Sequence, residues 1–212
     1  MTFTLLAVDR EAGLIGAATA SRSLAVGNAV IAVDPAVGAV ASQAWTNRAL
    51  RHHLLAAMAG GADAAAAIAR VPEHDPQPEL RQAAALDLAG RAAAHTGAGT
   101  SAWTGHRVGE DVVALGNLLA GPAVLDAIAE TWSRGAAGDA LAFAARLVAA
   151  LEAGEAAGGD ARGRQSAAVQ AAVIDRGARQ TPPALAVDLR SDDHERPLAE
   201  LRRLLALQGS SA

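Results

Sequence analysis

Residues 158–166, with the sequence GGDARGRQS, are the densest group of polar side chains in this sequence. Asp160, Arg162 and Arg164 follow a flexible Gly-Gly pair, and an apolar run typical of a buried strand comes directly afterwards. This order predicts a loop held over a cleft, where an acid and arginines would bind a charged ligand. The alternative is that the Asp and Arg side chains pair with one another and only fix a long loop.

Two other polar positions lie where a predicted strand ends. Gly116-Asn117 interrupts an apolar strand, and an Asn amide beside a tight turn is a good donor to a developing oxyanion. Asn also tolerates a positive φ, so a simple turn role is the alternative. His95 follows another strand end and would serve as an acid–base group or bind substrate, although a lone His is as often structural.

Gln43 belongs to the segment 42–47, SQAWTN, which leads from a predicted strand into a helix. We expect Gln43 to face the cleft. Thr46 or Asn47 would then cap the helix that follows, since both residue types are favoured at the N-cap. Cap and cleft roles both stay open for this segment.

Several kinds of chemistry are excluded by composition. The 212 residues contain no cysteine, no lysine and no tyrosine. Thiol nucleophiles, thiolate metal sites, Schiff bases and a phosphate-loop lysine are therefore impossible. The acids and the histidine in residues 188–194 precede the last predicted helix, so helix capping explains them better than a metal. We expect no metal and no cofactor.

Charge and hydropathy narrow the range of partners. The net charge is −4 and no basic run occurs, which argues against a nucleic-acid surface. Charged residues 9–11 interrupt the short apolar start, so it does not predict a signal peptide. The apolar stretch 24–45 contains Asn, Asp, Pro and several glycines and is a poor membrane span. We expect a cytoplasmic protein that acts on a small molecule.

The elements that position these residues follow from hydrophobic periodicity. Residues 2–9 and 14–21 predict one β-hairpin, and residues 80–97 predict another. Consecutive strands that join by hairpins predict antiparallel or mixed sheets. Two stacked sheets with helices outside would bury these strands. The chain length predicts one domain over residues 1–212. A doubly wound parallel fold is the rival, but strict alternation of strands and helices is lacking. Further strands are predicted within 25–34, 37–44, 112–118, 166–175 and 184–193, and helices within 48–60, 62–71, 122–133, 141–154 and 196–207.

The opening TFTLLAVDREAGLIGAATASRSLAVG resembles the start of N-terminal-nucleophile (Ntn) hydrolases, in which a leading Thr begins a strand. The pieces ASRSLAVG, ASQAWTN, AAHTG, GNLLAGP, AGGDARGRQSAA and DLRSDDHERPLAELRRLL are similar to a bacterial and archaeal family, domain of unknown function 1028. This family is assigned to the Ntn-hydrolase-like superfamily. The resemblance spans nearly the whole chain and implies an α+β fold, a four-layer αββα sandwich, with amide hydrolysis as the usual chemistry. It implies no substrate.

For Thr2 the resemblance implies the role of nucleophile. A hydroxyl needs an adjacent base, and a leading Thr carries one in its own α-amine, with a pKa near ~8. Met followed by Thr is a sequence that methionine aminopeptidase processes, which would expose this amine. Proteasome-like sites also use a lysine, for which Arg22 is an electrostatic substitute but no base. The alternative is that Thr2 only begins a strand.

The resemblance also implies the ligand contacts. Ser21 and Arg22 follow the second strand, where Ntn clefts place residues that contact the nucleophile, and Arg22 would clamp a carboxylate. An exposed turn arginine is the alternative for Arg22. The loop 158–166 resembles the Gly-Gly-Asp loops of amidohydrolases, which implies that Asp160 binds an ammonium group and Arg162 or Arg164 a carboxylate.

These expectations describe an Ntn-type amide hydrolase for a small charged, amino-acid-like substrate. Its Ala- and Leu-rich helices would pack against copies of itself in a homo-oligomer, as in proteasome-like relatives. Two alternatives stay open. One is a non-catalytic ligand-binding protein that retains Met1, and the other is an oligomeric scaffold that keeps only the fold.

Overall fold

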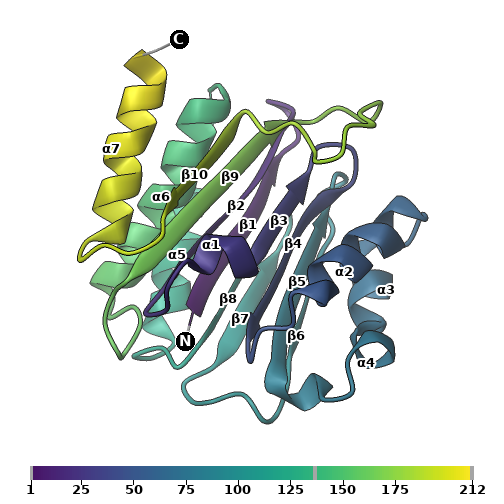
Figure 1. Cartoon of the computed structure of the whole chain (residues 1–212), viewed down its shortest axis with the longest axis horizontal. Coiled ribbons are helices and arrows are strands. Elements are labelled where there is room, and N and C mark those ends of the chain that lie inside the picture. The colour runs from purple at the N-terminus through teal and green to yellow at the C-terminus, as the bar shows by residue number, and fades with distance from the viewer. Residues whose placement is uncertain (1, 136–137, 211–212) are drawn as a thin grey trace.

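The computed structural model describes residues 2–135 and 138–210 and contains two antiparallel β-sheets with helices on both sides (Figure 1). The larger sheet has the strand order β10-β9-β2-β1-β8-β7, and the smaller sheet has the order β3-β4-β5-β6. The strands are β1 (Thr2–Asp9), β2 (Leu14–Ser21), β3 (Ile31–Asp34), β4 (Gly38–Ala44), β5 (Arg81–Asp87), β6 (Ala92–Thr96), β7 (Gly105–Gly109), β8 (Val112–Asn117), β9 (Ser166–Val173) and β10 (Val187–Ser191). The helices are α1 (Val26–Ala29), α2 (Ala49–Ala59), α3 (Ala64–Ala69), α4 (Val71–His74), the 3₁₀ helix η1 (Pro78–Leu80), α5 (Ala123–Ser133), α6 (Ala140–Ala156) and α7 (Pro197–Ser210).

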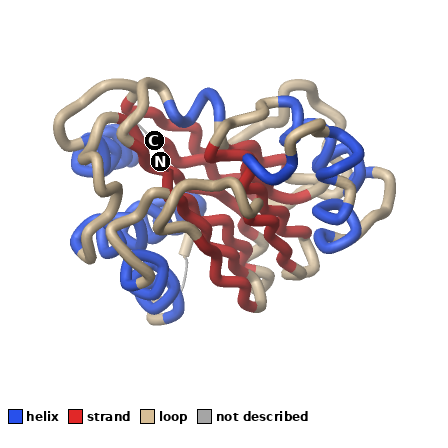
Figure 2. Tube along the Cα trace, turned by 90° about the horizontal axis from the view of Figure 1, so that it is seen from below, coloured by secondary structure: helices blue, strands red, loops and turns tan. Residues whose placement is uncertain are grey.

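Three separate hydrophobic cores hold the layers together. Helices α5, α6 and α7 bury one face of the larger sheet, with Leu125, Leu147 and Leu201 at the contact. The other face of the larger sheet packs on the smaller sheet. Helices α2 and α3 then cover the outer face of the smaller sheet. Figure 2 shows the strands between helices on either side. Strands covered on both faces explain the near-continuous apolar runs of the sequence.

One end of the larger sheet and one end of the smaller sheet lie together, and polar residues of both sheets meet there. β1 begins where β2 and β8 end, because Thr2 pairs with both Ser21 and Asn117. In the smaller sheet Gln43, near the end of β4, pairs with Gln82 near the start of β5. Side chains alternate between the two faces of a strand, so all five of these lie on the face shared with the inter-sheet core.

Several elements differ from the sequence-based expectation. The edge strand β7, with the sequence GHRVG, is not apolar enough to show a strand pattern. Helix α1 lies within 25–34, where only a strand was expected. Helix α4 carries Pro72 in its first turn, a position where proline is tolerated, so the proline does not end the helical region.

Helix α6 continues past its expected end at Gly154 to Ala156. Gly154 therefore lies inside the helix. A glycine is needed there because α5 packs closely, and a Cβ at this position would meet Ile128 Cγ1 at 2.6 Å. Although α6 is 17 residues long, no helix in the described part of the chain combines the length and apolarity needed to cross a membrane.

Candidate functional site

A group of neutral polar side chains fills the inter-sheet space at the end where β1 begins. It comprises Thr2, Thr4, Gln43, Gln82 and Asn117, and we call it the inter-sheet polar cluster. All five are buried, and the two glutamines are fully so. Buried polar groups are costly unless they are hydrogen-bonded, so their partners decide whether this cluster is tolerated.

Gln43 connects the two sheets within this cluster. Its Nε2 donates to the main-chain oxygen of Thr2 at 3.3 Å and to Gln82 Oε1 at 2.7 Å. Its Oε1 accepts from Thr4 Oγ1 at 2.6 Å, and Thr4 shares a 2.8 Å hydrogen bond with Thr19. Gln43 therefore faces the inter-sheet space, as its position in the sequence predicts, and fixes the main chain of β1 at its first described residue.

Gln82 is the centre of the cluster, and the sequence analysis did not single it out. Its Oε1 also accepts from Asn117 Nδ2 at 3.1 Å, and its Nε2 lies 2.9 Å from the carbonyl oxygens of both Gly105 and Gly116. It thereby links β5 to β7 and β8 across the gap between the sheets. A glutamine before an apolar run looks like an ordinary strand-start residue, and no signal in the sequence marks it.

The hydroxyl of Thr2 points toward the neighbouring strand. Thr2 Oγ1 donates to Ser21 Oγ over 3.2 Å, and the Thr2 residue keeps 7% of its surface exposed. Among the described residues, the side chains of Thr2 and Asn117 form hydrogen bonds with a hydroxyl and an amide, and none of these partners is a carboxylate. A base for the Thr2 hydroxyl must therefore come from elsewhere, and the α-amine of a leading Thr is the group that the sequence predicts.

Asn117 lies directly beside Thr2 in the sheet and is 2% exposed. The turn interpretation placed a positive φ at this residue, but the left-handed residue is the next one, Leu118, with φ 55°. Asn117 donates one hydrogen bond to Gln82, and an amide nitrogen carries two hydrogens. No hydrogen bond of the second hydrogen occurs among the described residues.

The nearest titratable ring of the cluster is His106 on β7. Its Nδ1 lies 2.9 Å from Thr96 Oγ1, and Thr96 in turn contacts Gln82 Nε2 at 3.1 Å. Burial, together with the positive charge of Arg107, lowers the pKa of His106. This shift favours the neutral form of the ring, and the amides of Gln82 and Gln43 separate the ring from Thr2.

A cavity of about 450 Å³ lies on the helix side of the larger sheet, beside the same strand ends. We call it the Ser21 cavity, since Ser21 contributes to its wall and also contacts Thr2. Phe3 and Ala20 form its floor, and the loop before β9 and the start of α7 form its sides. The polar residues on its wall are Ser21, Glu155, Asp160, Arg164 and Glu195.

The carboxylate of Asp160 is occupied by its own loop. Its oxygens accept from the backbone N–H groups of Arg22 at 2.7 Å and Arg162 at 2.8 Å, and it forms a 3.3 Å ion pair with the Arg162 guanidinium. These contacts fit the interpretation in which Asp and Arg fix a long loop. Asp160 still borders the Ser21 cavity, so the loop that it holds is one wall of that cavity.

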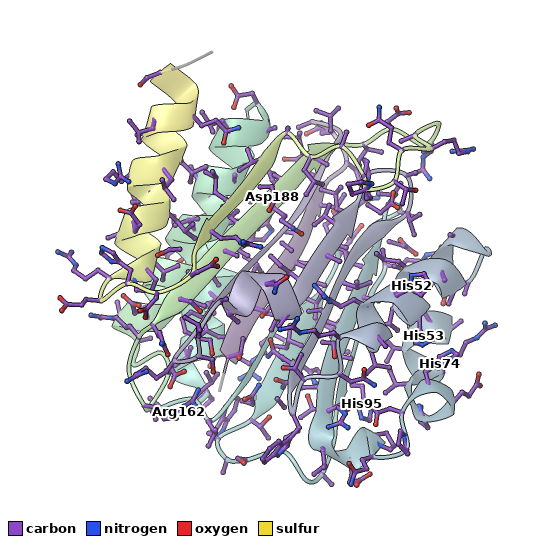
Figure 3. All side chains as sticks on the ribbon, viewed as in Figure 1. His52, His53, His74, His95, Arg162 and Asp188 are labelled. Atoms are coloured by element: carbon purple, nitrogen blue, oxygen red, sulfur yellow. The ribbon has the colours of Figure 1, made fainter. Side chains whose placement is uncertain are left out.

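The three arginines predicted to bind ligand differ in position. Arg164 lines the Ser21 cavity and forms a 3.0 Å ion pair with Glu155. The exposed side chain of Arg22 instead donates to Gln165 Oε1 at 2.9 Å. Arg162 lies at the outer side of the loop, as Figure 3 shows. Neither Arg22 nor Arg162 is among the described residues that border the cavity.

Glu155 is a cavity residue that the sequence analysis missed. It is half-buried on the last turn of α6, and burial raises its pKa against the opposing effect of Arg164. Ending the helix at Gly154 placed this glutamate in a loop, which hid its fixed position. Extending the predicted helix two residues past Gly154, to Ala156, would have placed Glu155 on the helix.

The structure does not bring His95 to this site. His95 pairs with Ala83 across β5 and β6 and shares its face, which packs under α2 and α3 outside the smaller sheet. Its Nε2 lies 2.8 Å from the Pro78 carbonyl oxygen, and Figure 3 places it near α4. The neighbouring Thr96 faces the inter-sheet space instead, because side chains alternate along a strand.

No group of three or more His, Asp or Glu side chains suited to a metal ion occurs among residues 2–135 and 138–210. Near the start of α7, His194 Nδ1 accepts from the Arg196 N–H at 2.9 Å, and Asp193 accepts from Gln165 Nε2 at 3.2 Å. These side chains therefore hold the turn between β10 and α7 and the loop before β9.

Comparison with known proteins identifies one family and similar solved structures. The model of a family of unknown function, DUF1028, matches residues 2–201. A crystal structure of a protein from Silicibacter pomeroyi assigned to the same family is 33% identical, with a TM-score of 0.84 over 97% of this chain and 88% of that one. No curated protein matches.

Proposed function

The chain belongs to DUF1028, a family of unknown function, and we propose that it is an Ntn-type amide hydrolase for a small charged substrate. We assign its two sheets and flanking helices to the four-layer αββα sandwich of Ntn-hydrolase-like proteins. The three separate hydrophobic cores support this assignment.

The proposal rests mainly on one observation: the first strand begins at a threonine whose main-chain oxygen accepts a hydrogen bond at the end of the inter-sheet space. Gln43 binds the carbonyl of Thr2, while Ser21 and Asn117 flank it on both sides. An ordinary strand-start residue needs no such support. A nucleophile does, because the reacting atoms must be held within a fraction of an ångström.

The reaction begins once Met1 has been removed. The neutral α-amine of Thr2 takes the proton from Oγ1, and Oγ1 attacks the carbonyl carbon of the substrate amide. The free hydrogen of Asn117 Nδ2 donates to the oxyanion that forms. The ammonium group then protonates the leaving amine as the C–N bond breaks. Water, deprotonated by the same amine, hydrolyses the remaining ester and restores the Thr2 hydroxyl.

The Ser21 cavity supplies the substrate-binding surface in this proposal. Its wall carries the acids Glu155, Asp160 and Glu195 and one cation, Arg164. Such a wall suits a ligand with an ammonium group and a carboxylate, as in an amino-acid amide. Thr2 is not among the described residues that border this cavity, and Ser21 is the link between the two: it borders the cavity, and its Oγ lies 3.2 Å from Thr2 Oγ1.

The test begins with intact-mass measurement of the protein from its native host, followed by an amide-library hydrolysis screen. We expect loss of Met1 and a kcat/KM that rises with pH as the α-amine deprotonates near ~8. Thr2→Ala should lower kcat by about 10³-fold or more, because it removes the nucleophile. Thr2→Ser, which keeps a hydroxyl and the same processing, is the matched control and should retain activity.

The proposal fails if Met1 is retained, or if Thr2→Ala hydrolyses the same amide as fast as the wild type. Retained Met1 combined with amino-acid binding would favour the non-catalytic ligand-binding protein. If no amide is cleaved, an oligomer detected by light scattering would favour the scaffold alternative. If an amide is cleaved, the oligomeric state does not decide between the two, since an oligomer can also be an enzyme.

A further inference from the structure

A second cavity lies at the opposite end of both sheets from Thr2. Its volume is about 660 Å³, and we call it the Arg176 cavity. The β3–β4 turn, the end of α2, the β5–β6 bend and the segment 176–183 form its wall. In Figure 1 the connection between β9 and β10 extends over these turns of the smaller sheet.

The connection is fixed in this position by hydrogen bonds to two different turns. The Asp175 N–H donates to the Pro35 carbonyl oxygen at 3.0 Å, which joins it to the β3–β4 turn. Arg176 NH2 donates to the Leu88 carbonyl oxygen at 3.4 Å, which joins it to the β5–β6 bend. The wall is therefore built from segments far apart in the sequence.

The charges on this wall are unbalanced. Arg91 forms a 2.7 Å ion pair with Asp87, so these two neutralise one another. Asp34, the other acid on the wall, accepts from the Ala36 N–H in its own turn. Arg176 and Arg179 have no carboxylate within ion-pair distance in the described part of the chain. Their hydrogen bonds go to main-chain carbonyl oxygens.

We propose that the Arg176 cavity binds a small oxyanion, a metabolite that carries a phosphate or two carboxylates. Guanidinium groups recognise both kinds of oxyanion through paired N–H donors. Arg176 and Arg179 supply those donors. Asp34 accepts from a hydroxyl or an ammonium group on the same ligand. The cavity volume lies within the range of small-molecule sites.

Isothermal titration calorimetry of the full chain with pyrophosphate and with citrate tests this proposal. We expect at least one of the two to bind, and the stronger one identifies the phosphate or the carboxylate chemistry. The double variant Arg176→Ala/Arg179→Ala should weaken binding by about tenfold or more, because it removes both unpaired cations. High ionic strength should weaken binding by the wild type as well.

The matched control is Arg48→Ala/Arg70→Ala, which removes the same charge from two exposed arginines that do not border the cavity. Its affinity should stay within about twofold of the wild type, since a net-charge effect falls off within a Debye length. An equal loss in both double variants, or no binding of either anion by the wild type, would overturn the proposal. Neither outcome bears on Thr2, so this site and the proposed hydrolase fail independently.

Discussion

The two ends of strand β5 fill the same inter-sheet space with opposite chemistry. Gln82 and Leu86 lie on one face of one strand, and both are fully buried. Leu86 belongs to the aliphatic core between the sheets, to which the larger sheet contributes residues such as Val8 and Val113. Around Gln82 the neighbours are polar: the amides of Gln43 and Asn117, the hydroxyl of Thr96, and main-chain carbonyl oxygens of β7 and β8. Burial alone therefore does not decide what a position in this core contains.

The difference lies in the partners available at each end. Among the described residues, no fully buried side-chain N or O atom of the inter-sheet polar cluster lacks a hydrogen-bond partner. A satisfied buried network fixes one arrangement of its groups, but an apolar core of the same volume would hold the sheets together at least as well. The polar end thus gives defined geometry where β1 begins, and the apolar end gives stability.

Leu86→Gln should have the largest effect, because it places an amide where no partner exists. The change loses the burial of a leucine and adds an unsatisfied polar group, for a loss of about 3–5 kcal/mol in the free energy of unfolding. Urea unfolding measures it. A loss below about 1 kcal/mol would mean that the apolar end can supply hydrogen-bond partners or water.

Gln82→Leu makes the converse change and should cost less, about 2 kcal/mol in the free energy of unfolding. The leucine regains apolar burial, but Asn117 Nδ2 and the carbonyl oxygen of Gly105 lose their partner. The same urea experiment applies, with Gln82→Glu as a second variant that keeps the shape. A Gln82→Leu protein more stable than wild type would show that the network only costs stability.

Asp75 supports the polar end from outside, and its contribution should depend on pH. Burial would raise its pKa, but hydrogen bonds from Arg81 and Asn47 more than offset this and lower the pKa to about 2. A carboxyl pKa that is lower in the folded than in the unfolded protein stabilises the folded state at pH values above the unfolded-state pKa. This stabilisation, about 2 kcal/mol, is lost as the pH falls from about 4 through 2.

Asp75→Asn should therefore lower the free energy of unfolding at neutral pH by about 2 kcal/mol and flatten its decline between pH 4 and pH 2. Asp126→Asn is the control, since it removes a carboxylate from an exposed ion pair with Arg107 and should change stability by about 0.5 kcal/mol or less. Parallel acid-unfolding curves for wild type and Asp75→Asn would show that Asp75 is not the group whose protonation lowers stability between pH 4 and pH 2.

Part of the candidate site follows directly from the sequence. Two strands that join by a short turn at residues 10–13 place Thr2 opposite Ser21 by counting alone, and the structure has this pairing. Asn117 is different. Its position beside Thr2 depends on β8 pairing with β1 across more than a hundred residues, which no local pattern reports.

His95 and Gln82 show where local reasoning ends. A strand pattern says that neighbouring side chains face opposite ways, but it does not say which face meets the other sheet. His95 lies outside the smaller sheet and Thr96 inside, so the residue at the predicted strand end was one position from the site.

The sequence by itself determined most of the strands and helices, since hydrophobic periodicity is a local property, but it did not reveal strand β7 or helix α1. It also excluded thiol and lysine chemistry, because those residues are missing. Only the tertiary structure decided that Gln43 and Gln82 of one sheet meet Thr2 and Asn117 of the other. The physical reason is that stacking joins faces whose residues are distant in sequence, and periodicity carries no information about which face covers which.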